Sequence, residues 1–65
     1  MTTYRIFRCG APNFVETEVR NNSGFPVEPI TMDDTMFIIN LLQEKYPHDE
    51  FVIVRSDGMR ARIMS

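Results

Sequence analysis

The dipeptide Asp57-Gly58 is the sequence feature that most constrains the fold of this chain. An Asp-Gly pair between two apolar segments favours a two-residue type I′ turn, because both central positions of that turn need a positive φ. The pair therefore predicts a β-hairpin whose strands cover residues 50–56 and 59–64. With a two-residue loop, Arg55 lies directly opposite Arg60.

This predicted register sorts the hairpin side chains into two faces, because opposed residues share a face and faces alternate along a strand. One face is small and apolar and is expected to meet a helix: Val52, Val54, Met59, Ala61 and Ile63. The other face is expected to be basic and partly apolar: Phe51, Ile53, Arg55, Arg60, Arg62 and Met64. Opposed like charges need an anion or a carboxylate between them. Glu16 or Glu18 of the same chain is the favoured source, and an external anion is the alternative.

A single amphipathic helix is predicted between Thr31 and Pro47. Thr31 is a good N-cap, Asp34 occupies the capping-box position three residues later, and the residue before Pro47 avoids helical angles. The helix is expected to extend to about Lys45. At 100° per residue, one apolar stripe faces the sheet: Met32, Thr35, Met36, Ile39, Leu42 and Tyr46, with Ile38 at its edge.

Two large apolar residues, Phe37 and Leu41, fall outside this stripe and lie one helical turn apart among acidic residues. Such a pair is typical of an anchor for a partner helix or groove. The alternative is that the loop containing Phe25 covers the pair, or that both side chains are isolated apolar surface residues.

Two further strands are predicted near the N-terminus, over residues 3–9 and 14–19, and the short connection "GAPN" joins them as a hairpin. Strict alternation in the second strand directs Glu16 and Glu18, with Phe14, away from Val15, Thr17 and Val19. The predicted fold is α+β with the order β-β-α-β-β, in which one helix packs on one face of a small antiparallel sheet. Residues 1–65 form one domain.

Size and cysteine content limit how this domain can be stabilised. A chain of 65 residues buries only about 60% of the surface that its unfolded form exposes. The single cysteine, Cys9, excludes an internal disulfide, and Cys9 with His48 is too small a set for a structural zinc site. No metal or other cofactor is expected, so self-association or a protein partner remains as reinforcement.

The chain has no apolar segment long enough to cross a membrane, and arginines stand where an export signal would have its apolar core. A cytoplasmic location is therefore expected, and no membrane contact. Charge is uneven along the chain: residues 31–50 contain one lysine and five acids, whereas residues 51–65 contain three arginines and one acid. The net charge of -2 argues against nucleic acid as the partner.

Our leading hypothesis is a small non-catalytic protein that docks on a partner protein and also self-associates, with a homodimer as the simplest assembly. Small proteins of this kind are often regulators or inhibitors of a larger machine, including virus-encoded ones. The candidate interaction surface comprises Phe37, Leu41, Phe51, Ile53, Arg55, Arg60 and Arg62. The alternative is a nucleic-acid-binding module that uses the arginines of the hairpin, with an affinity that falls steeply as salt increases.

A third possibility is catalysis, with Cys9 as nucleophile, His48 as base and Asp49 as the group that orients the base. A chain of 65 residues with one helix rarely encloses a substrate pocket. We therefore expect no enzymatic activity.

Overall fold

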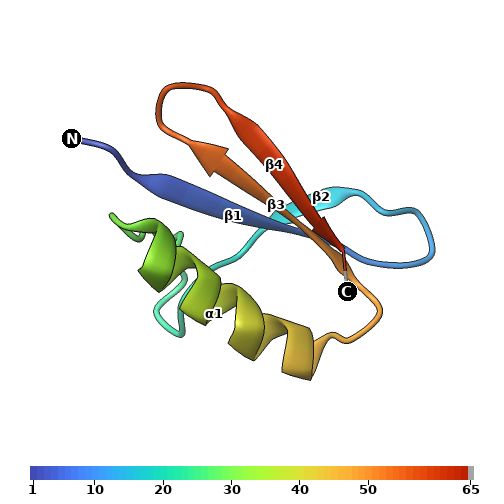
Figure 1. Ribbon diagram of the computed structural model, residues 1–65. Helices are drawn as coiled ribbons and strands as arrows, with labels where there is room; N and C mark the ends of the chain where they lie inside the picture. The colour runs from blue at the N-terminus through green and yellow to red at the C-terminus, as the bar shows by residue number, and fades with distance from the viewer. Residues whose placement is uncertain (65) are drawn as a thin grey trace.

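The computed structural model describes residues 1–64, and its elements follow the predicted order β-β-α-β-β. They are β1 (Tyr4–Cys9), β2 (Glu16–Glu18), α1 (Met32–Lys45), β3 (Glu50–Arg55) and β4 (Arg60–Met64). The four strands form one sheet in the order β2-β1-β3-β4, with antiparallel neighbours throughout. Figure 1 shows α1 lying on one side of this sheet. The predicted α+β fold is confirmed.

The core lies between α1 and the central strands β1 and β3. Ile6 of β1 pairs directly with Ile53 of β3, and both pack against Ile39 of the helix and Phe51. Burying side chains of this size contributes about 1.5–3 kcal/mol each. Further residues pack around this cluster while remaining partly exposed: Tyr4, Val19, Val27, Met36, Ile38, Leu42, Tyr46 and Ile63.

The helix ends where the sequence predicts. The Thr31 side chain accepts a hydrogen bond from the Asp34 backbone N–H at 3.1 Å, as an N-cap does. The Thr35 hydroxyl, which is buried, donates to the Thr31 carbonyl at 2.7 Å and so is satisfied within the helix. After Lys45 the chain leaves the helix before Pro47. The predicted apolar stripe faces the sheet, although Met32 at its start is 44% exposed.

The predicted register of the β3–β4 hairpin is wrong by one residue. The loop contains three residues, Ser56 to Gly58, because the Arg55 N–H donates to the Met59 carbonyl at 2.8 Å. Gly58 alone in this loop has a positive φ, 96°. A three-residue loop that ends in a left-handed glycine is the next most common hairpin solution after the two-residue turns. Asp57 supports it, because its carboxylate accepts from the Arg55 side chain and the Met59 N–H.

This shift exchanges the two faces of the hairpin. Phe51 now pairs with Ile63 and Ile53 with Ala61, so the face that was predicted to be exposed is the one that packs under α1. Val52 points to the opposite side. Arg55 and Arg60 lie on different faces and no longer oppose each other. The side chain of Met64, also predicted on the basic face, lies outside the described part of the chain.

The β1–β2 hairpin is confirmed, but β2 is shorter than the predicted strand. Cys9 pairs with Glu16, and residues 10–15 form the connecting loop. Phe14 has a φ of 54°, which is incompatible with a strand and removes it from the sheet. The predicted alternation holds beyond that point, since Val19 packs on the core whereas Glu16 and Glu18 face away from the helix.

We expect Thr31→Ala to lower the free energy of unfolding by about 1 kcal/mol, because the Asp34 N–H loses its acceptor. Urea denaturation followed by circular dichroism measures this loss. Thr31→Ser keeps an acceptor oxygen and is the matched control. Equal destabilisation by the two variants would show that the hydroxyl does not cap α1.

Asp57 makes hairpin stability depend on pH. The Arg55 side chain above all, and then the Met59 N–H, lower the pKa of Asp57 to about 2 from an ordinary value of 3.8. A folded pKa below the unfolded one stabilises the fold above the unfolded pKa, and that contribution is lost as the pH falls through about 2. Asp57→Asn keeps a turn-forming residue without the charge. The difference in unfolding free energy between wild type and Asp57→Asn should be constant near neutrality and shrink as the pH falls from about 4 towards 2. A difference that is independent of pH would contradict this assignment.

Candidate functional site

The structure distributes the seven predicted interaction residues over four places and does not join them into one surface. Phe51 and Ile53 lie in the core and offer no surface for a partner. Phe37 and Leu41 lie on the outer side of α1. Arg55 stands at the hairpin turn on the helix side, whereas Arg60 and Arg62 stand on the sheet face that points away from α1.

That second sheet face, here called the open face, carries ion pairs between its strands. Arg60 of β4 donates to Glu16 of β2 at 2.7 Å, and Arg62 donates to Glu50 of β3 at 3.2 Å. Arg5 of β1 donates to Glu18 through two nitrogens. The hydrogen bond from Arg5 lowers the pKa of Glu18. The interpretation that Glu16 neutralises the arginine face from within the chain is thus confirmed for Arg60.

These ion pairs share the open face with apolar groups that no helix shields. Val52 and Cys9 are 3% and 2% exposed although both face away from α1. Cys9 lies directly between Glu16 and Glu50 in the sheet register. Long arginine and glutamate side chains bury their aliphatic stems on such surfaces while their charged ends meet water. The arginines of the open face therefore serve the protein's own packing.

Cys9 is poorly suited to act as a nucleophile. Burial above all, with the negative charge of Glu16 in addition, raises the pKa of its thiol, so the reactive thiolate is scarce at neutral pH. Asp49, which was considered as an orienting group, accepts a hydrogen bond from Arg8 at 2.7 Å. His48 is exposed on the loop before β3.

Arg55 is also paired. Its guanidinium donates to both carboxylate oxygens of Asp57, at 3.0 and 2.6 Å. It lines a shallow apolar depression of about 90 Å³ between the start of α1 and β4, beside Met32 and Met59. Each of the three hairpin arginines therefore has a carboxylate partner within the chain.

The outer side of α1 presents an apolar ridge formed by Phe37 and Leu41, here called the outer ridge. Their exposed fractions are 65% and 53%, and they lie four residues apart on the helix. The loop that contains Phe25 does not cover them, since Phe25 is itself 68% exposed. The outer ridge is therefore open to solvent, as the partner-anchor interpretation requires.

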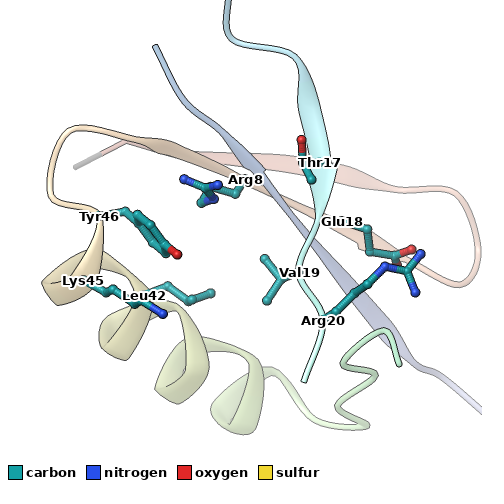
Figure 2. A pocket seen from close by; sticks show the side chains of 8 residues that line it. All are labelled: Arg8, Thr17, Glu18, Val19, Arg20, Leu42, Lys45 and Tyr46. Carbon is teal, nitrogen blue, oxygen red and sulfur yellow. The ribbon is translucent and has the colours of Figure 1, made fainter. Parts of the chain in front are cut away.

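A cavity of about 200 Å³, here called the β2 pocket, opens between β2 and the C-terminal half of α1. Figure 2 shows its lining side chains: Arg8, Thr17, Glu18, Val19, Arg20, Leu42, Lys45 and Tyr46. Sequence analysis did not single out this group, because its members come from three elements whose relative placement depends on the tertiary fold. The one local sequence signal for this pocket is a cation next to an aromatic residue, Lys45 and Tyr46, at the end of α1.

Among residues 1–64, no three histidine, cysteine or acidic side chains are grouped so that they could hold a metal ion. Within the same residues, α1 is too short and too polar to cross a membrane.

Comparisons with protein-family models, with curated proteins and with solved structures found no match to this chain.

The cover over Cys9 predicts a change in thiol reactivity. Arg60 carries a positive charge that lowers the pKa of the thiol, so the cover is tested with two variants that both lack this charge. Arg60→Ala, which also lacks the aliphatic stem, should be alkylated at Cys9 by iodoacetamide severalfold faster than Arg60→Gln. Each variant should cost less than about 1 kcal/mol of stability, as the loss of an exposed ion pair does. Mass spectrometry of timed samples measures the rates. Equal alkylation of the two variants would show that the Arg60 stem does not shield the thiol.

Proposed function

We propose that this protein is a non-catalytic protein-binding module that docks on a larger partner through the outer ridge. The observation that carries the proposal is the exposure of Phe37 and Leu41 at adjacent turns of one helix. An amphipathic helix that presents apolar residues at such spacing is a common ligand for a hydrophobic groove on another protein.

The size of the ridge favours a groove over a flat surface. The 14 residues of α1 make a helix of about 21 Å. Two apolar side chains become fully buried only if the partner surrounds them, and each then contributes about 1–2 kcal/mol, because only 65% and 53% of the two side chains is exposed beforehand. A groove lined by apolar residues meets this requirement, with Phe37 and Leu41 as the anchors.

The acidic residues beside the ridge indicate the charge of the partner. Asp33 and Asp34 stand at the start of α1 and Glu44 near its end, against the single cation Lys45. The two aspartates also stabilise the positive end of the helix dipole. A groove with a basic rim is therefore the complement of this face.

Self-association through the same ridge is expected to be weak. A stable interface of standard size buries about 800 Å² on each partner. Two side chains on one short helix provide far less than this. We therefore propose that a homodimer forms through the ridge at high concentration and that the partner protein competes with it.

By occupying a groove on a larger protein, the module would act as a regulator or inhibitor.

Nucleic-acid binding has less support. The hairpin arginines on which it depends are paired with Glu16, Glu50 and Asp57. A phosphate backbone would have to displace these carboxylates in a chain whose net charge is -2.

The test compares two double variants that remove equal amounts of exposed apolar surface. Phe37→Ala with Leu41→Ala removes the ridge, and Phe25→Ala with Ile30→Ala removes exposed side chains of the loop before α1. The immobilised wild type and the loop variant should retain the same protein from native lysate. The ridge variant should lose it, and sedimentation velocity should show that it loses self-association as well.

The capture from lysate is repeated after nuclease treatment and in moderate salt. Retention that survives both supports protein docking. The proposal fails if the ridge variant retains the same proteins as wild type, or if nuclease releases them. Circular dichroism of both variants should match wild type, because all four side chains are largely exposed.

A further inference from the structure

We propose that the β2 pocket is a binding site for an aliphatic monocarboxylate, either a glutamate side chain or a free short-chain carboxylate. This inference does not depend on the outer ridge. It rests on the shape of the cavity, the charges around it and the ring that positions them.

The pocket lies where α1 and the sheet diverge. Leu42 lines it from the helix and Tyr46 from the position just after the helix. Arg8 lines it from β1, and Val19, the residue that follows β2, lines it from the other side. Figure 2 shows the Tyr46 ring beside the Arg8 guanidinium, with the phenol oxygen directed towards the space in front of Val19. Polar groups and an apolar wall thus border one cavity.

The lining is basic although the chain as a whole is acidic. It contains three cations, Arg8, Arg20 and Lys45, against one carboxylate, Glu18. Glu18 is held by Arg5, which donates to both of its oxygens. Glu18 also interacts electrostatically with Arg20, and Arg8 is paired with Asp49, so among the described residues Lys45 is the lining cation whose charge is uncompensated.

Lys45 is the most available of the three cations. Arg8 donates to Asp49 at 2.7 Å, and Arg20 donates to the Gly24 carbonyl at 2.9 Å. Lys45 forms no ion pair with any residue from 1 to 64. An ammonium group without a counter-ion at the border of a cavity attracts an anion.

The Tyr46 ring holds the two nearer cations in place. The Arg8 guanidinium carbon lies 4.1 Å from the ring centroid, and the Lys45 ammonium nitrogen lies 5.3 Å from it. Both distances are within the range of cation–π attraction. Because Arg8 is already paired with Asp49, the positive charge that an entering anion meets is mainly that of Lys45, which the ring keeps beside the cavity.

The volume of the pocket limits the size of its ligand. At about 200 Å³ it is smaller than the roughly 300–1,000 Å³ of sites for small-molecule ligands. It can accept a group of side-chain size. Val19 and Leu42 supply an apolar wall suited to a short methylene stem, and the cations suit a charged end. A carboxylate on two or three methylene groups combines these features.

A singly charged group fits better than a phosphate. Leu42 to Lys45 form the last turn of α1 and Tyr46 caps it, and the carbonyl groups of that end carry partial negative charge. The Asp49 carboxylate, which forms an ion pair with Arg8, adds a full negative charge near the pocket. These charges oppose a dianion more strongly than a monoanion.

Titration monitored by ¹H–¹⁵N NMR tests the site with four probes. N-acetylglutamate N-methylamide represents a side chain, and butyrate represents a free ligand. N-acetylglutamine N-methylamide is the uncharged control, and inorganic phosphate at pH 8 is the dianionic one. Either carboxylate should cause saturable shifts at Val19, Leu42, Lys45 and Tyr46, with a Kd on the order of millimolar. The tighter of the two identifies the natural source.

Lys45→Gln should weaken carboxylate binding by about tenfold, the loss typical of one charge-assisted contact. Arg62→Gln removes one positive charge from the opposite sheet face and should leave binding unchanged. Arg8→Gln is a second pocket variant, and its spectral dispersion reports whether the fold is intact. The variant without the outer ridge should bind carboxylate normally, so this proposal and the proposed function fail separately.

Three outcomes would overturn the assignment. The glutamine probe could shift the same resonances with equal affinity, phosphate could bind more tightly than either carboxylate, or Arg62→Gln could weaken binding as much as Lys45→Gln. The last result would indicate a general response to charge and no defined site.

Discussion

The packing of α1 across β1 and β3 is the interaction on which the rest of this structure depends. Ile39 of the helix meets Ile6, Phe51 and Ile53, and these four side chains form the buried cluster. A chain of 65 residues supplies one such helix, and one helix covers one face of a sheet. The opposite face of the sheet and the ends of the helix are therefore either covered by other side chains or open to a partner.

The open face is protected by charged side chains. Exposed ion pairs contribute little through their charges, so we expect Arg60 and Arg62 to stabilise this face mainly through their aliphatic stems, beside the buried Val52 and Cys9. This use also explains part of the charge asymmetry along the chain, since Glu50 in the acidic segment pairs with Arg62 in the basic one.

Two features remain outside this internal pairing. The outer ridge is apolar with acidic neighbours, and the β2 pocket is small and basic, so the two are suited to different chemistry.

Much of the fold could be predicted from local patterns. The helix from Met32 to Lys45 followed from the Thr31 cap, the apolar stripe and Pro47, because each of these acts within a few residues. The exposure of Phe37 and Leu41 followed from the same periodicity. The β2 pocket could not be predicted in this way. Arg8 and Tyr46 are 38 positions apart and meet only when α1 packs against the sheet.

The sequence by itself determined the number, order and type of the elements, since apolar periodicity and turn residues are local properties. The tertiary structure decided which face of β3 became the core. Residues 51–54 are all apolar, so both faces of this strand can be buried and the hydrophobic pattern is compatible with either register. The left-handed Gly58 and the hydrogen bonds to Asp57 selected a three-residue turn. That choice placed Phe51 and Ile53 under the helix, and it left Arg60 and Arg62 to cover the other side of the sheet.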